Sequence, residues 1–82
     1  MKVTVYSTAA CPYCVKVKRW LSEHDISYRD AFVDADPQAM QRMVELSGQM
    51  SVPFILIEAV DDTMHSIIGY DEVRLAAAFA SL

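Results

Sequence analysis

The sequence predicts one α/β domain with four strands and three helices, in the order β-α-β-α-β-β-α. Three observations support this prediction. Runs of β-branched, aromatic and aliphatic residues that suit buried strands lie at residues 3–6 and 54–57. Two helix starts of the same kind, a capping residue followed by proline, lie at positions 11–12 and 36–37. A glycine, Gly48, stands where the second of these helices would end.

Length and composition limit the class of protein. A chain of 82 residues allows one small core, and its 54% hydrophobic content is enough to form that core without a disulfide framework. The chain opens directly into a strand without an apolar signal segment, and no run approaches the roughly 18 apolar residues of a membrane span. A net charge of −4 without a basic stripe argues against nucleic acid as a partner. We therefore expect a soluble cytoplasmic protein of a reducing compartment, with no membrane association.

The two cysteines, Cys11 and Cys14, lie at the predicted junction between the first strand and the first helix. Pro12 suits the first helical position, so Cys11 is the expected N-cap, with its sulfur facing the free N–H groups of the first turn. A helix N-terminus stabilises the reactive thiolate, and at such sites the pKa of the first thiol can fall from about 8.5 to about 3.5–7.5. Cys14, one turn further on the same side, should be more buried and remain protonated. The pair is predicted to be an attacking thiol and a resolving thiol.

Two other roles for this pair fit the sequence less well. A zinc site needs further ligands, and the two histidines, His24 and His65, are far apart and lack the spacing of a zinc motif. A structural disulfide would close a four-residue loop, which removes little chain entropy. The position of the pair therefore favours redox chemistry, and no metal site is predicted.

The first helix is expected over residues 12–24. Val17, Trp20 and Leu21 form its apolar side behind Cys14, and Trp20 is predicted to lie in the core. His24, near the helix end, is interpreted as a surface residue that interacts with the helix dipole rather than as a catalytic base.

A second strand is predicted over residues 26–33. Asp36 and Pro37 then begin a second helix, which ends at Gly48 in a left-handed conformation. The apolar stripe of this helix is Met40, Met43, Val44 and Leu46.

The last third of the chain predicts a hairpin and a helix. The continuous apolar run at 54–57 suits a central strand, a turn is expected at residues 61–62, and a fourth strand at 64–68. Gly69 ends that strand, and Asp71 is predicted to cap the last helix. The apolar residues of this helix are Val73, Leu75, Ala76, Phe79 and Leu82.

This order, with Cys-Pro-Tyr-Cys after the first strand, resembles the thioredoxin fold, a four-stranded mixed sheet flanked by three helices. The sequence is similar to glutaredoxins, and the likeness covers one domain over residues 1–82. Residues 11–14 match the dithiol glutaredoxin motif, and residues 51–53 match the Thr-Val-Pro segment of that family. Residues 69–72, Gly-Tyr-Asp-Glu, stand where the family has Gly-Gly-x-Asp-Asp/Glu.

The resemblance implies a substrate-binding site beside the cysteines. The Val52–Pro53 bond would be cis, which presents the backbone of Val52 to a peptide that docks like an added strand. Tyr13 would flank glutathione, and Asp71 would meet its ammonium group at the start of the last helix. Plainer alternatives are that Pro53 only begins an edge strand and that Asp71 is only a cap. The implied binding set is Pro12, Tyr13, Val52, Pro53, Gly69, Tyr70 and Asp71.

The sequence departs from the family in three places. Residues 7–10 lack the lysine that many glutaredoxins have before the first cysteine, and Arg42 or Gln38 on the second helix could compensate for its loss. The glycine pair is reduced to Gly69, followed by the bulky Tyr70. The segment 53–69 is several residues longer, which predicts a longer hairpin.

The resemblance implies a dithiol glutaredoxin, an enzyme that reduces disulfide-containing and glutathionylated proteins. It would have no tightly bound cofactor and would use glutathione as its reducing co-substrate. An alternative is a glutaredoxin-like redoxin that is reduced by thioredoxin reductase and serves ribonucleotide reductase, which the Gly-Tyr-Asp pattern also resembles. An iron–sulfur carrier, with two chains sharing a cluster through Cys11 and glutathione, is disfavoured. Pro12 stiffens the helix start, and a full cluster takes four thiolates.

Overall fold

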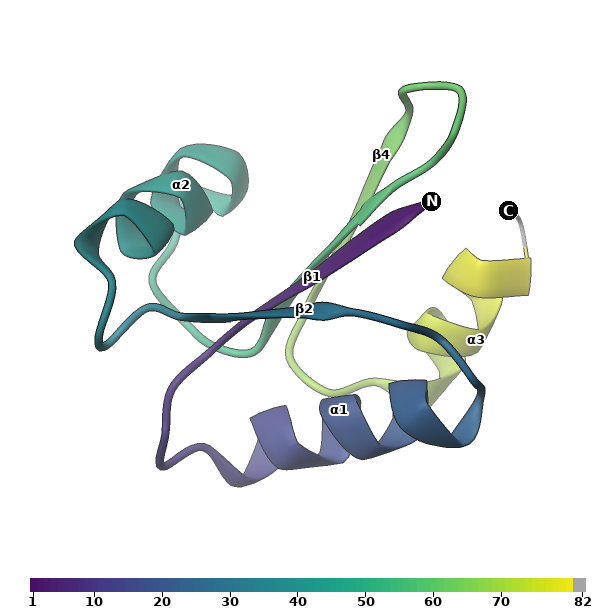
Figure 1. Cartoon of the computed structure of the whole chain (residues 1–82), viewed down its shortest axis with the longest axis horizontal. Coiled ribbons are helices and arrows are strands. Elements are labelled where there is room, and N and C mark those ends of the chain that lie inside the picture. The colour runs from purple at the N-terminus through teal and green to yellow at the C-terminus, as the bar shows by residue number, and fades with distance from the viewer. Residues whose placement is uncertain (81–82) are drawn as a thin grey trace.

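The computed structural model describes residues 1–80, and the predicted order of elements is confirmed (Figure 1). Leu82, predicted for the last helix, lies outside the described residues. No helix within residues 1–80 is long and apolar enough to cross a membrane. The elements are β1 (Lys2–Ser7), α1 (Pro12–Glu23), β2 (Arg29–Phe32), α2 (Pro37–Ser47), β3 (Phe54–Glu58), β4 (Met64–Ile68) and α3 (Glu72–Ala80).

The four strands form one mixed sheet in the order β2-β1-β3-β4. β1 pairs in parallel with β2, and the antiparallel hairpin β3–β4 extends the sheet on the other side of β1. β3 is central, as its apolar run predicts, because both of its edges are paired and the side chains of residues 54–57 are buried. Asp62, with φ of 67°, forms the left-handed position of the predicted hairpin turn.

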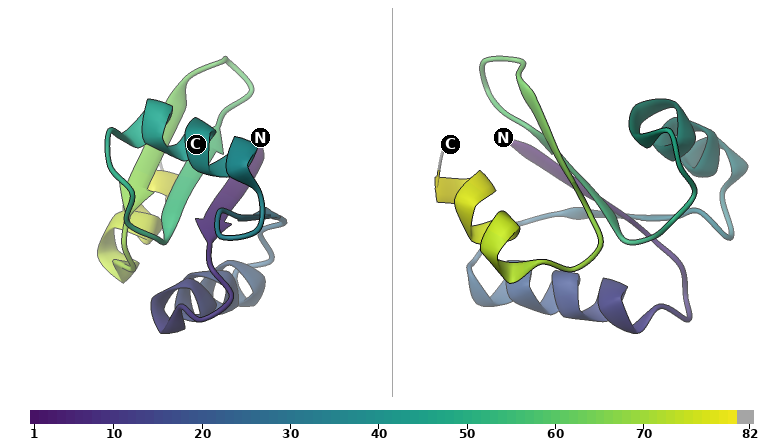
Figure 2. Two further views of the ribbon diagram at one scale, coloured as in Figure 1. Left: turned by 90° about the vertical axis from the view of Figure 1, so that its left-hand side faces the viewer. Right: turned by 180° about the vertical axis from the view of Figure 1, so that it is seen from behind.

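The helices cover both faces of the sheet, and Figure 2 shows α1 and α3 on one face and α2 on the other. Val17, Trp20 and Leu21 of α1 and Leu75 of α3 are buried in the core on the first face. On the second face, α2 buries Met43 against a cluster that includes Phe54 of β3. Both cores meet at β1 and β3, so the cysteine loop that follows β1 leaves from the most buried part of the sheet.

The second strand is shorter than predicted: pairing with β1 begins at Arg29, not at residue 26. The chain is still bound to the end of α1 before that point. Asp25 takes a left-handed φ of 56°, and the N–H of Ile26 donates to the carbonyl of Leu21 at 2.9 Å. Ile26 and Tyr28 are therefore half-buried against the α1 core instead of pairing with β1.

The apolar stripes of α2 and α3 are narrower than the sequence suggests. Met43 is the fully buried residue of the α2 stripe, whereas Val44 is exposed. On α3, Leu75 is fully buried, but Val73 is 79% exposed and faces away from the sheet. The α2 ends are as predicted, with Asp36 as N-cap and Gly48 in a left-handed conformation at φ 71°.

Candidate active site around the cysteine pair

Cys11 is the N-cap of α1, as predicted. Its backbone is extended, at φ −111° and ψ 105°, and Pro12 occupies the first turn. The N–H of Cys14 donates to the Sγ of Cys11 at an N···S distance of 3.1 Å, and the N–H of Val15 donates to the Cys11 carbonyl. The sulfur therefore accepts a hydrogen bond from the positive end of the helix, where a thiolate is stabilised.

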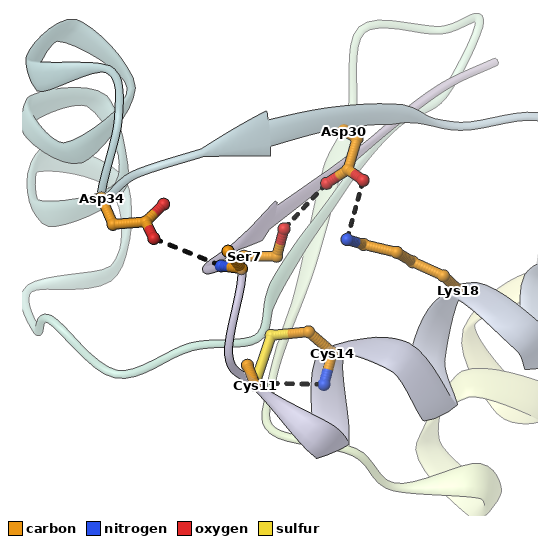
Figure 3. The surroundings of a disulfide bond; sticks show 7 residues. Ser7, Cys11, Cys14, Lys18, Asp30 and Asp34 are labelled. Carbon is orange, nitrogen blue, oxygen red and sulfur yellow. Dashed lines mark hydrogen bonds and ion pairs between the residues drawn. A yellow bond between two sulfur atoms is a disulfide. The ribbon is translucent and has the colours of Figure 1, made fainter.

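Cys11 and Cys14 are joined by a disulfide, with Cα atoms 5.2 Å apart (Figure 3). Cys14 is 1% exposed, whereas Cys11 is half-buried. A thiol that approaches from solvent therefore reaches Cys11 in preference to Cys14. This difference in access is the one that the sequence predicts for an attacking and a resolving thiol.

An aspartate that the sequence analysis did not single out holds the loop before Cys11. The Oδ2 of Asp34 accepts a hydrogen bond from the N–H of Ala9 at 3.2 Å (Figure 3). Asp34 follows β2, which is the parallel neighbour of β1, so both chain segments leave the sheet at the carboxyl ends of these strands. The parallel pairing of the two strands is the feature from which this contact could have been predicted.

A second group missed from the sequence is Ser7, Lys18 and Asp30. The hydroxyl of Ser7 donates to Asp30 Oδ1 at 2.8 Å, and the Nζ of Lys18 lies 2.7 Å from Asp30 Oδ2. Figure 3 shows these side chains on the same side of β1 and β2 as the disulfide. Residues 7–10 lack a charge, but a cation is present one turn beyond Cys14 on α1. The four-residue spacing from Cys14 to Lys18 was the sequence feature that could have indicated that this cation lies on the same side of α1 as Cys14.

The Val52–Pro53 bond is cis, as the resemblance implies. Pro53 leads into the central strand β3, so the alternative that it begins an edge strand is wrong. The N–H of Gly69 donates to the carbonyl of Pro53 at 2.8 Å, which joins the end of β4 to this loop. Gly69 has a φ of 83°, a left-handed conformation that favours glycine at this position.

Asp71 caps α3, as predicted: its Oδ1 accepts a hydrogen bond from the N–H of Arg74 at 3.1 Å. Its other carboxylate oxygen, Oδ2, lies 3.6 Å from the Arg74 Nε in an exposed pair. An exposed pair of this kind adds little stability, so this oxygen can exchange Arg74 for another cation. The cap and a ligand contact are therefore compatible in one side chain.

The two aromatic residues of the predicted site differ in their environment. Tyr13 is 59% exposed, with the Nζ of Lys16 5.2 Å from its ring centroid. Tyr70 is half-buried against the α1–α3 core. Its partial burial raises the pKa of its hydroxyl, and the carboxylates of Glu72 and Glu23 raise that pKa further. Tyr13 is therefore free to cover a bound group, while Tyr70 remains neutral.

Gln38 and Arg42 line a cavity of about 720 Å³ between α2 and the sheet. None of the residues predicted to be catalytic or substrate-binding lines this cavity. The structure thus places these two side chains at a separate cavity, of which the cysteines are not part.

Comparison with known proteins identifies close relatives. The Glutaredoxin family model matches residues 3–60. A protein named glutaredoxin from Neisseria meningitidis is 46% identical over 56 residues, which cover 67% of this chain and 66% of that protein, just under two thirds of its length. A glutaredoxin-like protein NrdH from Lactococcus lactis is 40% identical over 53 residues, covering 65% of this chain and 72% of that protein. The crystal structure of the thioredoxin-like protein BC3987 superposes with a TM-score of 0.80 at 28% identity, covering 93% of this chain and 97% of that one.

Proposed function

Because this chain belongs to the glutaredoxin family, we propose that it reduces protein disulfides and glutathione mixed disulfides and is itself reduced by glutathione. One observation carries the proposal: the Sγ of Cys11 accepts the helix N–H of Cys14, while the sulfur of Cys14 is buried behind it. That arrangement supplies one stabilised, accessible thiolate and one protected thiol.

The reaction is a sequence of thiol–disulfide exchanges. The Cys11 thiolate attacks a substrate disulfide, one substrate sulfur leaves as a thiolate and takes a proton, and a mixed disulfide with Cys11 remains. Cys14 then loses its proton and attacks the Cys11 sulfur, which releases the second substrate thiol and leaves the Cys11–Cys14 disulfide. Two glutathione molecules return two electrons to the pair and leave as glutathione disulfide.

The proposed glutathione site lies between the start of α1, the 52–53 loop and the start of α3. Tyr13 would cover one side of the tripeptide, and the backbone of Val52 would pair with it. The exposed Asp71 carboxylate would meet the ammonium group, and the first N–H groups of α3 would meet the neighbouring carboxylate. Pro12 and Pro53 would shape the two walls beside the sulfur, and Gly69 would keep the path to α3 open.

A specific observation favours a second candidate, reduction by thioredoxin reductase. Residues 7–10 offer no cation for the glycyl carboxylate of glutathione, and the half-buried Tyr70 occupies space before α3. The 40% identity with a glutaredoxin-like protein NrdH points in the same direction. We propose that glutathione remains the donor, with weakened affinity, because Tyr13, Val52 and Asp71 are all present.

Turnover measured against glutathione concentration tests this proposal, with NADPH and thioredoxin reductase as the parallel donor. We expect saturation only at high glutathione, because one lost charge-assisted contact lowers affinity about ten- to a hundredfold. Tyr70→Gly should lower the KM for glutathione, whereas Tyr70→Phe, which keeps the ring, should not. Ala9→Lys should also lower it, with Ala80→Lys as a distal control. Reduction by thioredoxin reductase without any turnover on glutathione would contradict the proposal and support the second candidate, in which thioredoxin reductase is the electron donor.

A further inference from the structure

The ion pair between Lys18 and Asp30 lies on the side of α1 that faces the sheet, next to the resolving cysteine. Lys18 follows Cys14 by four residues, and side chains at that spacing lie one above the other on a helix, with Cβ atoms about 5–6 Å apart. Cys14 is 1% exposed, and the side chains of Lys18 and Asp30 are 18% and 29% exposed. Partly buried charges interact with a neighbouring thiol more strongly than charges on an open surface.

The carboxylate of Asp30 is held in place from both sides. Its Oδ1 accepts from the Ser7 hydroxyl at 2.8 Å, and its Oδ2 contacts the Lys18 ammonium at 2.7 Å. Ser7 is fully buried at the end of β1, four residues before Cys11. Asp30 is paired across the sheet with Val5, whose side chain lies in the α1 core. The ion pair therefore joins β2 to α1, the helix that carries Cys14, and Ser7 links Asp30 to the end of β1, the strand that precedes Cys11 (Figure 3).

We propose that Lys18 and Asp30 set the thiol pKa of Cys14 by opposing effects, and so set how readily Cys14 resolves the mixed disulfide. The inference rests on the dithiol function proposed above. The ammonium favours the Cys14 thiolate, and the carboxylate disfavours it. Both are positioning residues, because each acts on the Cys14 thiol through its charge, while their side-chain polar contacts join them to each other and to Ser7.

The step that they influence is the second exchange. Cys14 releases its proton to water, and its sulfur forms a bond with the Cys11 Sγ. The bond between Cys11 and the substrate sulfur breaks, and the substrate leaves as a thiolate that takes up a proton. The ion pair takes no part in the making or breaking of these bonds. It alters only the fraction of Cys14 that is present as thiolate.

Other charged groups around the cysteines have separate partners. Lys16 lies over the Tyr13 ring, Asp34 accepts the N–H of Ala9, and Asp71 caps α3. Within the described residues, β1 and β3 each carry one charged side chain, Lys2 and Glu58, which are paired with each other at the end of the sheet away from the cysteines. β4 contributes only His65, which is paired with Ile57 near that same end.

The test measures the pKa of Cys14 in a Cys11→Ser background, where Cys14 is the only thiol, from the pH dependence of its ¹³Cβ chemical shift. Lys18→Gln should raise this pKa and Asp30→Asn should lower it, each by about half a pKa unit or more, below the 1–3 units of a direct contact pair. Matched controls remove exposed charges: Arg19→Gln on the outer face of α1 and Asp25→Asn at its end. Both controls should leave the pKa within about 0.2 of the parent value, since exposed charges are screened.

The opposite signs separate this proposal from a purely structural role. Loss of a structural contact would lower the melting temperature in both variants and move the thiol pKa in one direction or not at all. A pKa that moves in the same direction in both variants, or in neither, overturns the proposal, as would a failure of Lys18→Arg and Asp30→Glu to restore the parent value. Because neither substrate nor donor is present, the measurement is independent of whether glutathione or thioredoxin reductase supplies the electrons.

Discussion

The Cys11→Ser variant is expected to lose disulfide reduction on every substrate, by about a thousandfold or more, the scale on which removal of a nucleophile lowers turnover. Cys14→Ser should lose the reduction of protein disulfides but keep activity on glutathionylated substrates. The reason lies in the geometry: Cys11 is the accessible N-cap thiol, and Cys14 is 1% exposed behind it. In the absence of Cys14, a second glutathione can attack the mixed disulfide directly.

Both variants should be assayed on a glutathionylated peptide and on a protein disulfide, with near-UV circular dichroism as the check on folding. Serine also caps helices well, so α1 should form in the Cys11→Ser protein. A folded Cys14→Ser protein without activity on the glutathionylated peptide would show that the two roles are assigned wrongly. Activity that survives Cys11→Ser would have the same consequence.

Leu75→Ala should be the most damaging change in α3. Leu75 is fully buried against the core that contains Trp20 and Ile67, and truncation of a buried leucine costs about 2–5 kcal/mol of unfolding free energy. Small domains are stable by only about 5–15 kcal/mol in total. For a domain of this size, we expect the melting temperature to fall by about 10 °C or more.

The matched control for this change is Val73→Ala on the same helix. Val73 is 79% exposed, so its truncation should change the unfolding free energy by no more than about 0.5 kcal/mol. Urea denaturation of both variants measures the difference. Equal losses at the two positions would mean that α3 does not pack on the sheet through Leu75.

The fold was largely predictable because local signals agree with one another. The caps at Cys11 and Asp36, the left-handed Gly48 and the apolar run of β3 all lie where their chemistry predicts. The second strand was predicted three residues too early. The sequence shows apolar residues at 26 and 28, but not that the N–H of Ile26 remains bonded to the end of α1.

Site residues could be predicted where the neighbouring sequence determines their position. They could not be predicted where two elements distant in the sequence have to come together. The N-cap position of Cys11 follows from Pro12, and the cis bond before Pro53 follows from the family resemblance. The Lys18–Asp30 pair depends on the parallel register of β1 and β2, which brings Asp30 opposite Val5. No local pattern around Asp30 encodes that register.

The proposed chemistry depends on a Cys11 thiol that is activated by the start of α1, and the pKa of that thiol tests the activation most directly. In the Cys14→Ser variant, thiolate absorbance near 240 nm followed against pH gives the pKa of Cys11 alone, and the same protein unfolded in urea supplies the reference. We expect a folded-state midpoint within about 3.5–7.5, against about 8.5 for the unfolded chain. With no cation in residues 7–10, the midpoint should lie in the upper part of that range. A folded-state midpoint equal to the unfolded one would show that the start of α1 does not activate Cys11.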